Sequence, residues 1–96
     1  MALPEYFDDG ARVTGRITLP LHVRWSDPEL SYDLDDPHER RMVYEQVLVE
    51  GTEDDVRRFV DPDVLLHEFS ELVLPPHVRR AWVAWFRRHR GVEPTC

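Results

Sequence analysis

Lysine and asparagine are absent from this sequence of 96 residues, and cysteine occurs once, at Cys96. A single thiol cannot form a disulfide within the chain, which is typical of proteins from a reducing compartment. No run of residues approaches the roughly 18 apolar positions of a membrane-spanning helix. Residues 1–10 lack the basic and apolar segments of a secretory signal peptide. We therefore expect a cytoplasmic protein.

Motifs that carry catalysis are also missing. There is no phosphate-binding loop, no glycine-rich dinucleotide turn and no cysteine pair for zinc. Asp61, Asp63 and His67 come nearest to a metal cluster, but Asp61 and Asp63 fit the first turn of a helix. His67 and Glu68 are sequence neighbours that would point about 100° apart on a helix, which is poor geometry for a proton relay. The sequence therefore predicts a non-enzymatic protein with no catalytic, cofactor or metal site.

The chain does contain enough apolar sequence for one domain. Hydrophobic residues make up 42% of it and three residues are tryptophans, which argues against a disordered chain. A length of 96 residues fits a single domain near the lower limit for an independent core. We expect a flexible tail over residues 1–11 and one small α+β domain over residues 12–96.

Alternation of apolar and polar residues predicts a β-hairpin near the N-terminus. Residues 17–25 follow a period of two, with apolar side chains on one side of the strand. Pro20 cannot donate a backbone hydrogen bond, so this strand should lie at an edge or carry a bulge there. Residues 26–29 have the composition of a turn. The pattern predicts strands 16–25 and 29–34, joined by a four-residue loop, with an apolar face that packs on helices.

Four short helices are predicted after the hairpin. Asp36 before Pro37, and Thr52 before a run of acidic residues, have the chemistry of helix N-caps. Gly51 and Gly91 stand where helices should end. The predicted helices cover residues 37–50, 53–60, 62–72 and 76–90. The predicted fold class is α+β, an N-terminal β-hairpin packed on a bundle of four short helices.

Helical spacing separates core positions from surface positions. Six residues of the last helix fall within one arc of about 140°: Val78, Ala81, Trp82, Trp85, Phe86 and His89. The tryptophans should therefore belong to the core. In the first helix Met42 and Val49 lie nearly opposite the main apolar face. An exposed apolar pair is often without function, but it is also typical of a partner surface.

Charge is segregated along the chain, whose formal net charge is −7. Residues 27–71 carry 15 acidic side chains and four arginines, whereas residues 77–90 carry five arginines and no acid. Part of this pattern suits the helix dipoles. The acidic stretch also presents a negative surface to a basic partner. We predict protein binding through five residues: Met42, Glu45, Val49, Glu53 and Asp54.

The arginines of the last helix suggest an alternative, a small DNA-binding transcriptional regulator. The final two helices would form a helix-turn-helix, with four arginines facing the phosphates: Arg79, Arg80, Arg87 and Arg88. This helix has no Asn, Gln, Ser or Thr to read bases, so phosphate contact is easier to support than sequence recognition. The sequence leaves both interpretations open.

Three segments carry a resemblance to a known group of proteins: Leu19–Trp25, Arg41–Arg57 and Leu72–Trp82. Over roughly residues 17–90 the chain resembles small actinobacterial proteins encoded beside nucleotidyltransferase-like toxins of the abortive-infection type. The resemblance implies the antitoxin or accessory half of a toxin–antitoxin system, cytoplasmic and non-enzymatic. It agrees with the charge pattern, because a small acidic protein that covers the basic cleft of such a toxin would block it electrostatically and sterically.

Overall fold

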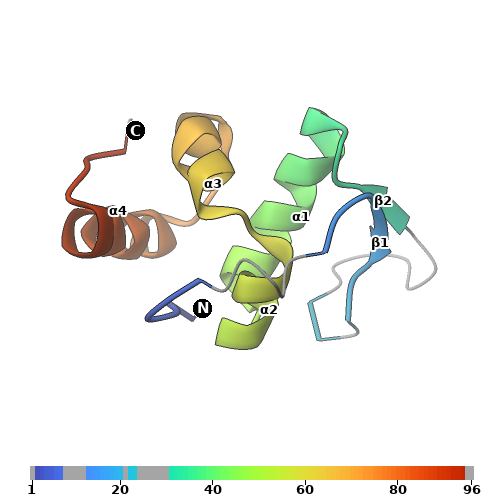
Figure 1. Cartoon of the computed structure of the whole chain (residues 1–96), viewed down its shortest axis with the longest axis horizontal. Coiled ribbons are helices and arrows are strands. Elements are labelled where there is room, and N and C mark those ends of the chain that lie inside the picture. The colour runs from blue at the N-terminus through green and yellow to red at the C-terminus, as the bar shows by residue number, and fades with distance from the viewer. Residues whose placement is uncertain (1, 8–12, 21, 24–30, 95–96) are drawn as a thin grey trace.

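The computed structural model describes residues 2–7, 13–20, 22–23 and 31–94 (Figure 1). The strands are β1 (Arg16–Thr18) and β2 (Ser31–Asp33). The helices are α1 (Pro37–Glu50), α2 (Glu53–Phe59), α3 (Pro62–Glu68), the 3-10 helix η1 (Phe69–Glu71) and α4 (Pro76–Arg90). An antiparallel hairpin followed by four α-helices confirms the predicted α+β class. Figure 1 shows the hairpin at one end of the long axis and α4 at the other.

The hairpin is shorter than predicted. Ile17 pairs with Tyr32 at the centre of a ladder of three residues on each strand. Beyond Thr18 the chain leaves the ladder, because Pro20 has no N–H to donate. The carbonyl of Pro20 instead accepts a hydrogen bond from Val23 N at 3.0 Å. The prediction of a strand over residues 16–25 is therefore wrong beyond Thr18 in the described residues, and the loop predicted at 26–29 lies outside them.

Side-chain caps set the starts of α1, α2 and α3, as predicted. Asp36 and Asp61 each accept a hydrogen bond from the backbone N–H two residues later, at 2.9 Å. Thr52 and Asp55 form a reciprocal capping box, in which Asp55 N donates to Thr52 Oγ1 and Thr52 N donates to Asp55 Oδ2. These bonds satisfy backbone donors that a helix N-terminus leaves without partners. The predicted helix starts are confirmed.

The glycines that follow α1 and α4 end these helices for different reasons. Gly91 has φ +63°, in the left-handed region that favours glycine. Gly51 is extended, with φ −79°, a conformation open to any residue. A Cβ on Gly51 would lie 2.6 Å from the carbonyl oxygen of Val47, so lack of space requires glycine there.

One hydrophobic core joins the hairpin to all the helices. Trp82 is completely buried at its α4 end, where it contacts the rings of Trp85 and Phe86 at centroid distances of 5.1 and 6.0 Å. At the other end Tyr32 of β2 is buried and its hydroxyl accepts a hydrogen bond from Gln46 of α1 at 3.4 Å. The predicted core face of α4 is confirmed for its tryptophans. No helix in the described part of the chain has the length and apolar content needed to cross a membrane.

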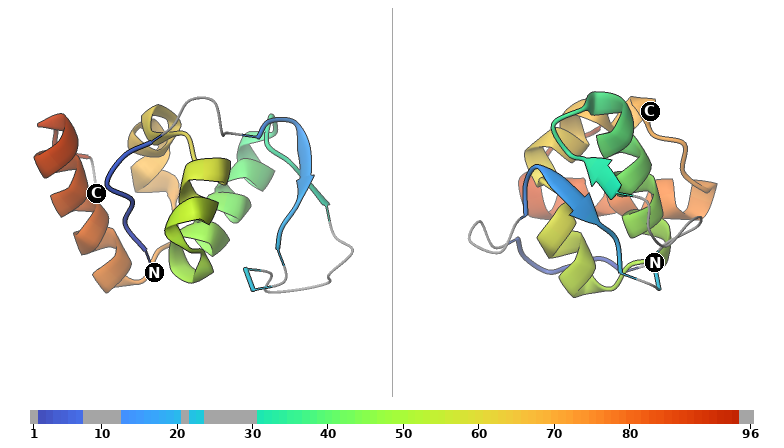
Figure 2. Two further views of the ribbon diagram at one scale, coloured as in Figure 1. Left: turned by 60° about the horizontal axis from the view of Figure 1, so that its bottom comes forward. Right: turned by 90° about the vertical axis from the view of Figure 1, so that its right-hand side faces the viewer.

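Residues 2–7 pack against the domain, although the sequence predicted a tail there. Figure 2 shows this segment running between α4 and α2. Pro4 is fully buried, and its carbonyl accepts a hydrogen bond from the indole N–H of Trp85 at 2.5 Å. Leu3 and Phe7 also pack against the core. The packed part of the chain therefore includes residues that precede the predicted domain boundary at residue 12.

Candidate functional site

The two arginines of α1 both turn toward one buried carboxylate. Arg40 donates from Nη2 to Glu68 Oε1 at 2.6 Å and from Nε to Oε2 at 3.3 Å, and Arg41 Nη1 lies 3.7 Å from the same carboxylate. Arg40 also donates to the carbonyl of Leu34 at 3.2 Å. The hydrogen bond with Glu68 raises the pKa of Arg40. Glu68 on α3 thus compensates the basic charge of α1.

The outward side of α1 is therefore acidic. Asp36 and Glu50 are exposed, Glu39 is half-buried, and Met42 has 38% of its surface accessible. At 100° per residue, Glu39, Met42 and Glu50 fall within an arc of about 80° on α1. We call these four residues the acidic surface. An accessible methionine beside carboxylates, with the arginines of the helix directed elsewhere, suits an apolar contact surrounded by negative charge.

The structure separates the five residues predicted to bind a partner. Met42 belongs to the acidic surface, but Val49 is half-buried and packs against the core. Glu45 is half-buried, and its Oε2 accepts a hydrogen bond from Val73 N at 2.7 Å. Asp54 forms an ion pair with Arg57. Glu53 lines a cavity beside α4, so the five do not form one surface.

The four arginines predicted to contact nucleic acid also lie in two separate places on α4. Arg79, Arg80 and Arg87 line one depression of about 490 Å³ on the outer side of α4, whereas Arg88 lines a different cavity. Arg79 and Arg87 also have partners within the chain. Arg79 donates to the carbonyls of Phe69 and Leu72, and Arg87 pairs with Glu93. Arg80 is exposed.

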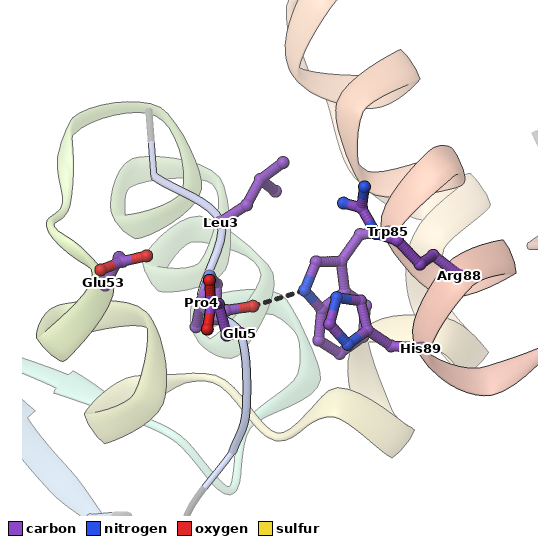
Figure 3. Close-up of a pocket in the computed structure, with 7 residues that line it drawn as sticks. All are labelled: Leu3, Pro4, Glu5, Glu53, Trp85, Arg88 and His89. Atoms are coloured by element: carbon purple, nitrogen blue, oxygen red, sulfur yellow. Dashed lines mark hydrogen bonds between the residues drawn. The ribbon is translucent and has the colours of Figure 1, made fainter.

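A further cavity, which the sequence did not predict, lies beside the N-terminal segment (Figure 3). It measures about 500 Å³ and is lined by Leu3, Pro4, Glu5, Glu53, Trp85, Arg88 and His89. Figure 3 shows the stacked rings of Trp85 and His89 on one side and Glu53 on the other, with the segment between them. A sequence signal did exist, because Leu3, Pro4 and Phe7 are apolar residues in a segment interpreted as a tail.

His22, which follows β1, contacts Asp55 of α2. His22 Nε2 lies 2.6 Å from Asp55 Oδ2, while Asp55 also completes the capping box with Thr52. Burial raises the pKa of Asp55, but the hydrogen bonds from Thr52 and His22 outweigh burial and hold this pKa below its ordinary value. The Thr52 hydroxyl accepts a hydrogen bond from Asp55 N, so both side chains are committed to holding the start of α2.

Neither a metal-binding cluster among the described residues nor similarity to a known protein indicates a function for this site. Within the described ranges, no three His, Cys, Asp or Glu side chains come together in a group that could hold a metal ion. No protein-family model, no curated protein and no solved structure matches this chain.

Proposed function

We propose that this protein is a non-enzymatic binding module whose acidic surface docks on a basic region of a partner protein. The observation that carries the proposal is the direction of the α1 arginines. Arg40 and Arg41 both turn to Glu68 rather than to the acidic surface, where Asp36 and Glu50 are exposed to solvent. Met42 supplies an apolar contact among them. Such a surface attracts a basic partner over a distance and then excludes water at the centre.

The resemblance noted for the sequence suggests the class of partner. A nucleotidyltransferase-like toxin that acts on RNA needs a basic cleft for its substrate, and an acidic antitoxin can cover that cleft. In this proposal the protein acts in the cytoplasm as the antitoxin or accessory partner of the toxin. The acidic surface would compete with the phosphates of the substrate for the same basic side chains.

DNA binding through α4 has weaker support. Arg79 is committed to the carbonyls of Phe69 and Leu72, and Arg87 to Glu93. A phosphate would have to replace these internal partners. Arg80 and Arg88 are exposed, but they line separate cavities, so the four arginines do not form one row along a phosphate backbone.

The test is a pair of substitutions on the acidic surface. Glu50→Arg reverses a charge in the last turn of α1, where the helix dipole favours a basic residue, so the fold should tolerate it. Met42→Asp places a charge in the apolar contact. The double variant, immobilised and exposed to native-host lysate, should no longer retain the nucleotidyltransferase that the wild-type protein retains, as measured by mass spectrometry.

Glu71→Arg is the matched control, because it makes the same charge reversal at an exposed position outside α1. It should retain the partner. Retention of the nucleotidyltransferase by the double variant would contradict the proposal. If only the Arg80→Glu and Arg87→Glu double variant lost the partner protein, the interface would lie on α4 instead. If the same double variant lost the ability to bind promoter DNA, the DNA-binding alternative would gain support.

A further inference from the structure

The N-terminal segment lies on an aromatic floor. Trp82, Trp85 and His89 of α4 form this floor, which we call the aromatic groove. The Trp82 and Trp85 rings lie 5.1 Å apart, and the His89 ring stacks on Trp85 at 4.5 Å with an interplanar angle of 19°. Arg88 stands on the α4 rim and Glu53 on the α2 rim (Figure 3).

Residues 2–7 occupy this groove in the manner of a bound peptide. The indole N–H of Trp85 donates to the Pro4 carbonyl at 2.5 Å, and the Pro4 ring is fully buried. Phe7 stands edge-on to Trp85, with centroids 5.5 Å apart at 89°. Aromatic grooves bind extended proline-containing peptides through such contacts, since ring surfaces hold the proline and a polar donor fixes the backbone.

The segment does not fill the groove. Cavities of about 500 and 340 Å³ flank it, and both are lined by Glu5, Trp85 and His89. Tyr6 is 62% exposed and contacts α2 through the guanidinium of Arg57, 4.9 Å from its ring centroid. Within the described residues, the bond from Trp85 is the one hydrogen bond that joins residues 2–7 to the helices. A segment with bulkier side chains beside its proline would bury more of the same surface.

The charged residues around the aromatic groove further define which peptides it can bind. Arg88 lines one flanking cavity, and Arg90, whose guanidinium pairs with Asp63 at 2.7 Å, lines the other; Glu5 lines both. If residues 2–7 left, Glu5 would leave with them and the α4 rim would lose this carboxylate. An incoming peptide with an acidic residue directly after its proline would restore the charge balance.

We propose that the aromatic groove binds an extended segment of a partner protein with the pattern proline, acidic residue, any residue, aromatic residue. Residues 2–7 carry this pattern themselves and hold the site when the partner is absent. This site is separate from the acidic surface, so the inference does not rest on the proposed function.

The experiment titrates a synthetic peptide into the full chain. The probe is the acetylated peptide with the sequence of residues 2–8, and NMR follows the indole N–H of Trp85. In the wild-type protein residues 2–7 compete with the peptide, which raises its apparent Kd. Phe7→Ala weakens this competition and should lower the apparent Kd about tenfold. Val73→Ala, at an 81% exposed position away from the groove, is the control and should match the wild type.

A saturable shift of the Trp85 indole signal with the tenfold difference supports the proposal. No shift in either protein, or equal binding of a peptide whose proline and phenylalanine are replaced by serine, overturns it. Where Phe7→Ala fails to fold, Glu5→Arg weakens the competing segment at an exposed position, and an unchanged apparent Kd overturns the proposal. A concentration-dependent wild-type dimer that Phe7→Ala abolishes would assign the groove to a second copy and also overturn it.

Discussion

Individual charged residues in this protein often bind backbone groups of distant segments. Glu45 accepts from Val73 N, and Arg79 donates to the carbonyls of Phe69 and Leu72. Hydrogen bonds of this kind, to a charged group, contribute about 1.5–3 kcal/mol each. Glu45 and Val73 are 28 residues apart, and no periodicity within one helix predicts such a contact. For this reason we predicted from the sequence that Glu45 binds a partner protein and that Arg79 contacts nucleic acid in the alternative interpretation.

At the same scale, Trp82 tests the core. Trp82→Ala should destabilise the domain by about 3–5 kcal/mol, because it empties the centre of the α4 packing. The buried indole N–H of Trp82 finds no hydrogen-bond partner in the described part of the chain. Trp82→Phe removes this donor and keeps most of the ring volume, so it should cost clearly less than Trp82→Ala. Urea denaturation measures the free energy of unfolding of both variants. Equal losses of stability would contradict the assignment of the Trp82 ring to the core.

Asp55 makes the stability of the domain depend on pH in the acidic range. Its pKa in the folded protein is lowered, so its contribution to stability is present above the ordinary aspartate pKa of about 3.9 and is lost as pH falls through the folded value. Asp55→Asn should cost about 0.5–2 kcal/mol at pH 7 and should flatten the loss of stability in acid. Thermal unfolding between pH 7 and pH 3 measures this.

Asp54→Asn is the matched control in the same turn of α2. Asp54 is exposed and pairs with Arg57, so its loss should change stability by less than about 1 kcal/mol. An unaltered acid profile for Asp55→Asn would show that the capping box and the His22 contact contribute nothing to stability.

At the scale of elements, helices were predictable and the N-terminal parts were not. The starts of α1, α2 and α3 are each set by a cap within three residues, which a single sequence displays. The length of β1 depends on Pro20 ending the ladder, a possibility that alternation alone did not decide. The placement of residues 2–7 depends on Trp85, 81 residues from Pro4, and composition does not reveal that pairing. The aromatic groove could therefore not be predicted from the sequence.

The two helix-ending glycines should respond differently to substitution. Gly91→Ala forces a left-handed alanine, at a cost of about 1–2 kcal/mol, and nothing crowds its Cβ. Gly51→Ala meets the Val47 carbonyl and must move the junction of α1 and α2, so it should cost more. Equal losses in urea denaturation would show that the junction shifts easily.

At the scale of the whole molecule, the acidic surface and the arginine-rich helix lie apart. The acidic surface lies on α1, while five of the twelve arginines lie on α4, at the opposite end of the long axis from the hairpin (Figure 1). Association of the acidic surface with a basic toxin should therefore be fast at low ionic strength. Between about 50 and 500 mM salt the association rate should fall at least about tenfold, with a smaller change in dissociation. Stopped-flow mixing with the toxin measures both rates, and a salt-independent association rate would contradict the proposal.

The contact between Pro4 and Trp85 also sets an order of events during synthesis. Residues 2–7 leave the ribosome before α4, and Trp85 follows Pro4 by 81 residues. At roughly 5–20 residues per second, the N-terminal segment waits on the order of 4–16 seconds for its binding site. During that interval Tyr6 and Phe7 have no groove to enter, and chaperones can reach them. Packing of the N-terminal segment is thus complete only when α4 has emerged and folded.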